Sequence, residues 1–283
     1  MSRIAYVNGS YVPHANACIH IEDRGYQFAD GIYEVWAVRA GKLLDSSGHF
    51  RRMGRSLGEL RIATPMSDGA LDVVLHEVVR KNRVRDGLVY LQITRGVAPR
   101  DHAFPKDIVP SIVITAKSMN VAEAERKAQK GIAVITVPDE RWTRCDIKSV
   151  SLLPNILAKQ SAVEQGAYEA WMVDEKGMVT EGSSSNAWII TEGDVLVTRN
   201  LSNDILGGIT RERVLKLAAE RQLSVEERAF SLKEARKAKE AFISSSINLV
   251  TPITHIDKQP VGDGKPGAMA CALRKDYLQS AAT

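Results

Sequence analysis

Hydrophobic and polar residues alternate over several short stretches at the start of the chain. The stretch IAYVNGSYVP predicts two strands joined at Asn8-Gly9, a dipeptide typical of tight hairpin turns. GIYEVWAVRAGKLL predicts a second hairpin, with its turn at Ala40-Gly41. The same pattern returns later in two further stretches, LVYLQITRG and PSIVITAKS. These alternations predict a sheet in which hairpins are prominent.

Two segments between these strands have apolar residues at helical spacing. They are residues 49–60 and residues 68–82. In the second, one stripe is formed by Leu71, Val74, Leu75, Val78 and Val79. We therefore expect two helices that bury one face each.

The polar, helix-prone stretch NVAEAERKAQKG predicts a domain boundary near residue 120. After it, GIAVITVPDE has the pattern of a strand and LLPNILAKQSAVEQG that of a helix. Two hairpins, two helices and a strand are predicted in the stretches YEAWMVDEKGMVTEG, NAWIITEGDVLVTR, RERVLKLAAERQ, SLKE and AFISSS. We expect two α+β domains, residues 1–120 and 121–283, rather than a doubly wound parallel sheet.

The composition excludes several classes of protein. Lys and Arg number 38 and Asp and Glu 34, interspersed to a net charge of +4, which gives no support for nucleic-acid or membrane-surface binding. The three cysteines are far apart, which argues against a disulfide framework and against a metal site. Without a signal-like or membrane-length apolar run, we expect a cytoplasmic protein.

Lys148 lies just after a strand-like run, in the mixed segment RWTRCDIKSV. Loss of hydration in an interior favours the neutral amine, which can attack an aldehyde to form a Schiff base. A lysine that reaches water or pairs with Asp146 is the simpler interpretation of this segment alone.

VTEGSSSNAW, residues 179–188, places Glu181 beside three serines. The segment is either a solvated turn or a polar surrounding for a ligand. In the second case Glu181 could keep a heterocyclic nitrogen protonated, as carbanion chemistry on pyridoxal phosphate requires.

LGGITRERV, residues 206–214, leads two glycines into a helix whose first N–H groups could bind phosphate, together with the Thr210 hydroxyl. Ser244, Ser245 and Ser246 could add donors or form a simple turn. In the loop TRGVAPRDHAFP, Arg100 and His102 would project to one side, where they could bind a carboxylate. An ordinary exposed loop is the alternative.

Together these blocks resemble the fold-type IV pyridoxal-phosphate enzymes, and most of all the D-amino acid aminotransferases. The match also includes EDRGYQFADGIYEV, the HFRRM segment and FISSSINLVTP, in the family's order, from residue 22 to residue 252. The resemblance implies a smaller N-terminal α/β domain and a larger C-terminal pseudo-barrel domain that carries the Schiff-base lysine, with the cofactor, pyridoxal 5'-phosphate, between them.

The resemblance also implies a role for individual residues. Lys148 would be the Schiff-base lysine and proton carrier, and Glu181 the partner of the pyridine nitrogen. The phosphate would be bound by Arg52, Ile209, Thr210, Ser245 and Ser246. The ring would be seated by Ser184 and Leu206, and the substrate carboxylate would meet Tyr33, Arg100 and His102.

The implied reaction is transamination of D-amino acids, such as D-alanine, with a 2-oxo acid, such as 2-oxoglutarate, by a ping-pong mechanism. The family forms homodimers in which the Arg100 and His102 loop reaches the partner's site. One departure is that Ala37 replaces a basic residue found in some relatives, with bulky Trp36 before it, and this could alter a pocket wall.

Other reactions are known on the same scaffold. They belong to branched-chain L-amino acid aminotransferases, (R)-amine aminotransferases and aminodeoxychorismate lyases, and the loop with Arg100 and His102 argues against them. A non-catalytic binding protein is disfavoured because Lys148 and Glu181 are both intact.

Overall fold

The computed structural model describes residues 3–280, and their contacts divide the chain into two compact units. The first unit extends to Val121 and also includes Ile147–Ser151. The second unit begins at Ala122 and contains the rest of the described chain. The domain boundary predicted from the sequence placed the Lys148 segment in the second domain, residues 121–283. In the structure this segment packs with the first unit.

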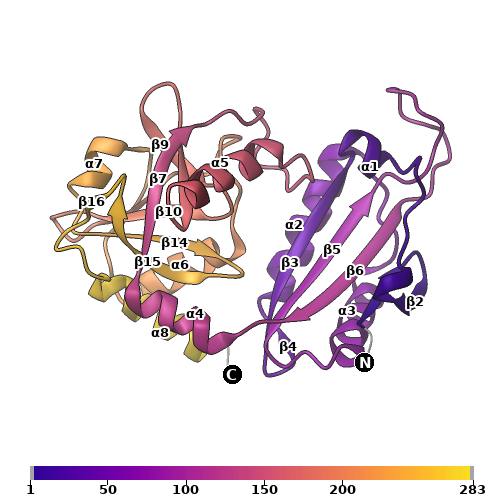
Figure 1. Cartoon of the computed structure of the whole chain (residues 1–283), viewed down its shortest axis with the longest axis horizontal. Coiled ribbons are helices and arrows are strands. Elements are labelled where there is room, and N and C mark those ends of the chain that lie inside the picture. Colours follow the sequence, from indigo (N-terminus) through magenta and orange to yellow (C-terminus); the bar gives the residue numbers. More distant parts are fainter. Residues whose placement is uncertain (1–2, 281–283) are drawn as a thin grey trace. The chain divides into compact units, whose positions relative to one another are not determined.

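The first unit is built on an antiparallel sheet with the strand order β2-β1-β6-β5-β3-β4 (Figure 1). Its strands are β1 (Ile4–Val7), β2 (Ser10–Pro13), β3 (Gly31–Arg39), β4 (Lys42–Leu43), β5 (Gly87–Thr94) and β6 (Ser111–Ser118). The predicted hairpin turn at Asn8-Gly9 is confirmed, since both residues have positive φ, 44° and 95°. A 3₁₀ turn, η1, covers His14–Asn16.

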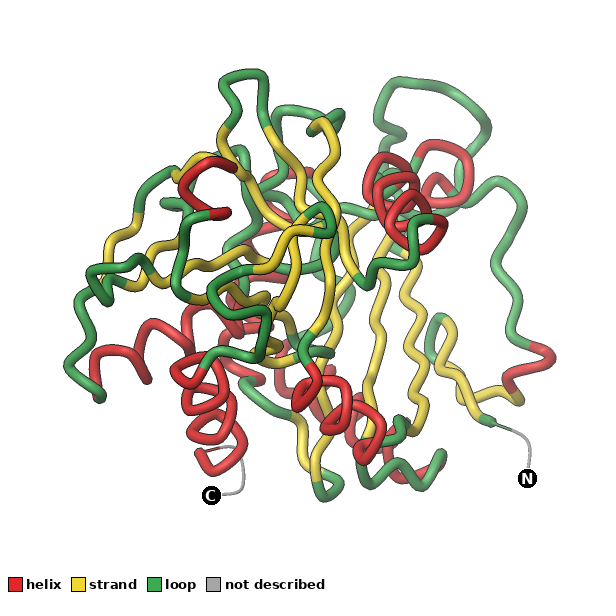
Figure 2. The backbone as a smooth tube through the Cα atoms, turned by 60° about the vertical axis from the view of Figure 1, so that its left-hand side comes forward, coloured by secondary structure: helices red, strands yellow, loops and turns green. Residues whose placement is uncertain are grey.

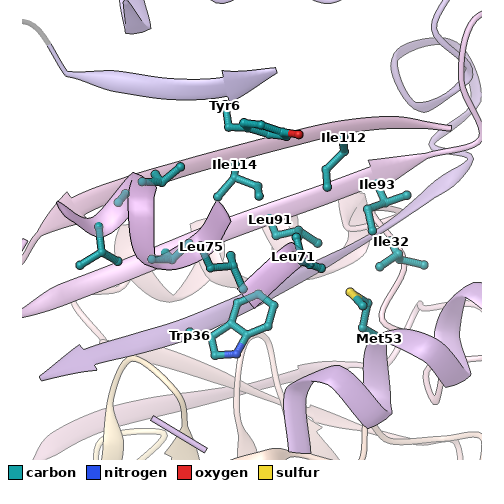
Figure 3. Close-up of a cluster of buried hydrophobic side chains, with 14 of the residues drawn as sticks. Tyr6, Ile32, Trp36, Met53, Leu71, Leu75, Leu91, Ile93, Ile112 and Ile114 are labelled. Carbon is teal, nitrogen blue, oxygen red and sulfur yellow. The ribbon is translucent and has the colours of Figure 1, made fainter. Parts of the chain in front are cut away.

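Two helices, α2 (Ser46–Leu60) and α3 (Asp68–Lys81), cover one face of this sheet. The predicted stripe of α3 packs against Trp36, Leu91 and Ile114 of the strands (Figure 3). The helix begins after Ser67, whose hydroxyl accepts a hydrogen bond from Ala70 N at 3.3 Å. Truncating a core leucine such as Leu75 to alanine would cost about 2–5 kcal/mol of stability.

Residues of β3 alternate between the two faces of the sheet. Ile32, Glu34 and Trp36 lie on the helix-covered face and are fully buried, whereas Tyr33 and Val35 lie on the other face and are partly exposed. Trp36 therefore belongs to the core, whereas Ala37 follows on the face of Tyr33 and Val35, and its effect on a pocket wall stays a prediction.

The second unit is built on a mixed sheet with the strand order β12-β11-β10-β14-β15-β7-β8-β9-β13, to which β16 adds beside β15. Its strands are β7 (Ile132–Pro138), β8 (Glu169–Val173), β9 (Met178–Gly182), β10 (Asn186–Ile190), β11 (Leu196–Thr198), β12 (Val225–Glu227), β13 (Phe230–Ser231), β14 (Glu240–Ser245), β15 (Leu249–Ile256) and β16 (Gln259–Pro260). Val197 and Phe230 come from opposite ends of this order but belong to one core cluster. The sheet must therefore curl around that cluster, as the strands in Figure 2 do.

Helices pack against this curled sheet. They are α4 (Val121–Lys130), α5 (Leu153–Glu164), α6 (Ile209–Glu220), α7 (Leu232–Arg236) and α8 (Ala268–Ser280). Helix α5 contacts β8, α6 contacts β14, and α8 contacts β15. The predicted start of a short helix at Ser231 is confirmed, because its hydroxyl accepts a hydrogen bond from Glu234 N at 3.1 Å.

Several elements were not predicted from the sequence, and three of them show why. Helix α1 (Arg24–Phe28) is too short to show a period. Strand β15 contains Pro252, which normally argues against a central strand. Helix α8 buries Arg274 on its apolar stripe, where the guanidinium donates to the carbonyls of Asn248 and Val250 at 2.8 and 2.7 Å.

Candidate active site

Lys148 lies beside the start of β3 in the first unit. Its carbonyl accepts a hydrogen bond from Tyr33 N at 3.0 Å, and Val150 N donates to Gly31 O at 3.0 Å. The Lys148 N–H donates to the Ser56 hydroxyl of α2 at 3.2 Å. Bonds to both a strand and a helix therefore hold the main chain at this residue.

The side chain of Lys148 is half-buried, not enclosed as a fully interior lysine would be. Its Nζ lies 4.0 Å from the centroid of the Tyr33 ring. Tyr33 stacks on Tyr90 with ring centroids 5.9 Å apart, and burial with the nearby Tyr33 raises the pKa of Tyr90 to about 12. The amine thus lies against an aromatic ring and keeps part of its surface exposed, as a lysine expected to react with a bound aldehyde requires.

Glu34 is a carboxylate on the core face of β3. It accepts hydrogen bonds from Arg52 Nε and Nη2 at 2.8 and 2.7 Å, and it contacts His49 Nδ1 at 2.7 Å. Burial acts to raise its pKa, but Arg52 and His49 outweigh burial and lower the pKa to about 2. The charged Glu34 therefore fixes the orientation of Arg52, the expected phosphate ligand.

Arg100 and His102 lie on an exposed loop that follows β5. Both side chains gather around Phe28 of α1: the guanidinium carbon of Arg100 is 4.8 Å from the ring centroid, and the His102 ring centroid is 5.4 Å away. The structure therefore brings the two expected carboxylate ligands to one aromatic ring.

Glu181, on β9 of the second unit, is also withdrawn from water. Arg141 Nη1 donates a short hydrogen bond to it, Asn186 Nδ2 donates at 3.0 Å, and Leu206 N donates at 3.2 Å. Burial raises the pKa of Glu181 to about 7 against the opposing effect of Arg141. A carboxyl group with this pKa can exchange a proton near neutral pH.

Arg141 is a neighbour of Glu181 that had no predicted role. It is 5% exposed and also donates to Asp139, from Nε at 2.9 Å and from Nη2 at 2.7 Å. Burial acts to raise the pKa of Asp139, but the bonds from Arg141 lower it overall. The signal in the sequence was an arginine two residues after an aspartate, at the end of a buried strand.

The three serines after Glu181 all point to Glu169 of β8. Ser183 makes a short hydrogen bond to this carboxylate, and Ser184 and Ser185 donate to it at 2.9 and 3.2 Å. Glu169 is fully buried. The serine turn is therefore a fixed structure and not a solvated loop.

Helix α6 begins at Ile209, and among the described residues no side chain caps its first turn. Thr210 is 2% exposed, and its Oγ1 has no hydrogen-bond partner within residues 3–280. Gly208 packs so closely on Asn186 that a Cβ there would lie 2.0 Å from Asn186 Oδ1. Unsatisfied N–H groups and a buried hydroxyl at one helix start are the features of an anion site.

Asn186 links three segments of the second unit by hydrogen bonds: β9, the loop at Leu206, and β14. Its Nδ2 also donates to Leu206 O at 2.9 Å, and its main chain pairs with Ser244 of β14. Ser245 and Ser246, which follow on the same strand end, are half-buried, and Ser245 Oγ accepts a hydrogen bond from Asn248 N at 3.1 Å. Asn186 lies in the VTEGSSSNAW motif, but the motif alone predicted no role for it.

Residues 31–256 match the family model of class IV amino-transferases. The chain belongs to the class IV aminotransferases.

This class IV aminotransferase is similar to enzymes described as D-alanine aminotransferase. It is 41% identical to the one from Bacillus licheniformis over 279 residues, which cover 97% of both chains. It is 42% identical to the one from Listeria monocytogenes serotype 1/2a over 274 residues, 96% of this chain and 94% of the relative. The family resemblance inferred from the sequence is confirmed.

The fold of the aminotransferase matches solved relatives. A branched-chain amino acid aminotransferase from T.th., described with pyridoxamine 5'-phosphate, superposes with a TM-score of 0.91 at 25% identity, covering 99% of this chain and 94% of that one. The expected fold-type IV architecture is confirmed, with an antiparallel sheet domain and a curled, barrel-like sheet domain.

Each unit brings some of the expected site residues together. The first unit brings Tyr33 to Lys148, and holds Arg100 and His102 on a separate loop. The second joins its ring and phosphate candidates through Asn186; these are Glu181, Leu206 and the start of α6.

Two other kinds of feature are missing from the described part of the chain. No helix in residues 3–280 is both long enough and apolar enough to cross a membrane. The same residues contain no cluster of three His, Cys, Asp or Glu side chains arranged to hold a metal ion.

Proposed function

We propose that this class IV aminotransferase transfers the amino group of D-amino acids such as D-alanine to a 2-oxo acid such as 2-oxoglutarate. The observation that carries the proposal is the 41–42% identity to D-alanine aminotransferases over nearly the whole of both chains. The structural relative described as a branched-chain amino acid aminotransferase is only 25% identical. The loop with Arg100 and His102 supports the same choice. Both side chains lie beside the Phe28 ring, and both can donate hydrogen bonds to a substrate carboxylate.

The proposed cofactor is pyridoxal 5'-phosphate. The start of α6 fits its phosphate: the first N–H groups of this helix lack intrahelical partners, and the buried Thr210 hydroxyl is unpartnered among the described residues. We assign the phosphate to Ile209 and Thr210, with Arg52, Ser245 and Ser246 as further ligands, on the family motifs. When bound, the cofactor supplies an electron-accepting ring for the charge that develops at the substrate Cα.

Glu181 is assigned to the ring nitrogen. Its pKa of about 7 lets it share a proton with a pyridine nitrogen, and Asn186 and Leu206 N hold its oxygens in place. Ser184 and Leu206 are assigned to the ring itself.

Lys148 is assigned as the residue that links to the cofactor and carries the proton of the reaction. Its Nζ would accept the proton lost from the substrate Cα and deliver it to the aldehyde carbon of the cofactor, C4′. Tyr33, 4.0 Å from Nζ, would border the substrate on the same side. Arg100 and His102 would bind the α-carboxylate and so select the enantiomer whose Cα–H faces Lys148.

A substrate panel tests the reaction. Amino transfer to 2-oxoglutarate is measured with D-alanine, L-leucine and an (R)-amine, and pyruvate release is measured with aminodeoxychorismate. The proposal expects D-alanine to be used best. A preference for L-leucine, the amine or the lyase reaction would replace it with the corresponding alternative.

The role of Lys148 has a separate test. Borohydride treatment of the holoenzyme, followed by peptide mapping, should place the cofactor on Lys148, and Lys148→Ala should hold the cofactor without a covalent bond. Labelling of another lysine would contradict the assignment.

We also propose a homodimer. Helix α5 exposes Leu153, Ile156, Leu157 and Val163, each between 56% and 65% accessible in the single chain. An apolar stripe of this kind on a helix is typical of a protein interface. Light scattering after chromatography should give a dimer mass, and Leu157→Glu should shift it toward the monomer, whereas the exposed-site control Lys216→Glu should not.

A further inference from the structure

The motif EDRGYQFADG, residues 22–31, carries part of the family resemblance but has no role in the reaction described so far. In the structure it forms main-chain hydrogen bonds with residues 95 and 96, where the loop that bears Arg100 begins. Arg24 N donates to Gly96 O at 2.9 Å, and Arg95 N donates to Asp30 O at 3.0 Å. The motif therefore forms the base on which this loop is built.

The Arg24 side chain is 3% exposed although the loop it contacts is exposed. Its Nη1 donates to Asp101 O at 2.5 Å and to Ala103 O at 3.4 Å, and its Nη2 donates to His102 O at 3.4 Å. One guanidinium thus binds three successive main-chain carbonyls, directly after Arg100. Only a planar, multi-donor side chain can do this.

Asp30 sets the direction of this guanidinium. It accepts from Arg24 Nε at 2.9 Å and from Arg95 Nε and Nη2 at 2.7 and 2.9 Å. Burial acts to raise the pKa of Asp30, but the two arginines lower it overall. Arg24 therefore turns Nε toward a permanent anion and both Nη groups toward the loop.

Phe28 extends the support from the main chain to the side chains. The guanidinium carbon of Arg24 lies 4.8 Å from its ring centroid, and that of Arg100 also lies at 4.8 Å. The His102 ring lies at 5.4 Å. Arg24 and Arg100 are both stacked on one ring, and such contacts fix orientation at modest energy.

We propose that Arg24 is a positioning residue for substrate recognition. It holds the carbonyls of Asp101–Ala103 and, through Phe28, orients Arg100 and His102 to bind the α-carboxylate of the amino acid. The inference rests on the proposed function, since it takes these two side chains as the carboxylate ligands.

Kinetics of the holoenzyme test the role. In Arg24→Ala we expect KM for D-alanine and the inhibition constant of propionate, a simple carboxylate, to rise together by about 10- to 100-fold, because misplaced ligands bind poorly. The kcat and the cofactor affinity should change less than about threefold. Arg24→Lys keeps the charge beside Asp30 but lacks the planar donors, so it should recover only part of the loss.

Amide hydrogen exchange gives a readout that does not depend on turnover. Peptides covering residues 97–104 should exchange faster in Arg24→Ala than in the wild type. Arg80→Ala, an exposed arginine of the same unit on α3, is the matched control and should change neither exchange nor kinetics. Phe28→Leu keeps the main-chain bonds and should raise KM with a smaller change in exchange.

The results distinguish failure of the proposed role of Arg24 from failure of the proposed function of the loop. If Arg100→Ala raises KM for D-alanine and Arg24→Ala does not, the inference alone fails. If Arg24→Ala weakens the cofactor and kcat as much as KM, its role is general stability and the inference also fails. If Arg100→Ala leaves KM unchanged, or the wild type does not turn over D-alanine, the proposed function of the loop fails first.

Discussion

Glu34 in the first unit and Glu181 in the second are both carboxylates withdrawn from water, and each faces an arginine. Burial acts to raise the pKa of both. Yet the pKa of Glu34 falls to about 2, whereas that of Glu181 rises to about 7. Both glutamates are buried, but Glu34 stays ionised at neutral pH whereas Glu181 can exchange a proton there.

The difference lies in the charged neighbours that act on each carboxylate. Arg52 gives two nitrogens to Glu34, which also contacts His49. Arg141 is divided between Glu181 and Asp139, and the negative charge of Asp139 raises the pKa of Glu181 further. Arg141 therefore offsets burial less at Glu181 than Arg52 does at Glu34, because a second carboxylate, Asp139, lies beside Glu181 and raises its pKa.

Each arrangement suits a different task. A permanently charged Glu34 can orient Arg52 at any physiological pH. Glu181 has the proposed role of sharing a proton with a ring nitrogen, and a pKa near neutrality supports that role. The contrast leads to four predictions, given in descending order of expected effect.

Glu34→Gln should cost about 3–5 kcal/mol of unfolding free energy, because it removes the buried carboxylate that accepts two hydrogen bonds from the Arg52 guanidinium. Urea unfolding at pH 7.5 measures this. Glu77→Gln is the matched control: Arg80 bonds Glu77 with the same two-nitrogen geometry, at 2.7 Å each, but at the surface. The control should have no measurable effect, and an equally small effect of Glu34→Gln would contradict the contrast.

Glu181→Gln should lower kcat/KM for D-alanine by about 10²- to 10³-fold, since the developing charge loses its electrostatic partner. Its unfolding free energy at pH 7 should not fall, because Arg141 keeps Asp139 as a counter-ion and the raised pKa of Glu181 already disfavours the folded state at this pH. Steady-state kinetics and urea unfolding check the two parts. Glu175→Gln, in an exposed turn, is the control, and a large stability loss with normal kinetics in Glu181→Gln would reverse the assignment.

Arg141→Gln should raise the pKa of Glu181 further, because the opposing cation is gone. More of the carboxyl is then protonated at pH 7, and activity there should fall about tenfold and recover as the pH rises. A pH profile of kcat/KM measures the shift. Arg144→Gln, three residues later and bonded to Asp146, should leave the profile in place; a uniform, pH-independent loss in Arg141→Gln would point to misfolding instead.

The pH dependence of stability should differ in sign between the two carboxylates. The raised pKa of Glu181 means that the folded state binds its proton more tightly, so its contribution falls as the pH rises from 4.5 to about 7. The lowered pKa of Glu34 gives a contribution that is present above pH 4.5 and is lost toward pH 2. Unfolding of cofactor-free wild type and of each Gln variant, compared pH by pH, should show these windows. Equal slopes would show that the two carboxylates do not differ.

Much of the fold could be predicted because its elements have strong local signals. The period of α3 and the turn at Asn8-Gly9 depend on residues close together in the chain, and both are confirmed. Strand β15 and helix α8 could not be predicted, because Pro252 and Arg274 carry the wrong local signal and are accommodated only by distant partners.

The candidate site divides in the same way. Its motifs could be recognised from order and spacing, and so could residues such as Lys148 and Glu181. Arg141 and Asn186 could not be assigned a role, because the bond from Arg141 to Glu181 spans 40 positions of the chain. The hydrogen-bond partners of Arg24 lie 77 to 79 positions away in the chain, so they could not be predicted from the sequence either.

The order of residues alone was enough to identify the family, most of the strands and helices, and the residue types that the chemistry requires. Folding in three dimensions was needed to show which carboxylate stays charged, which has a pKa near neutrality, and which arginine bonds the main chain of the loop after Arg100. Burial and ion pairing depend on groups brought together from distant parts of the chain, and a pKa is set by those neighbours and not by the residue alone.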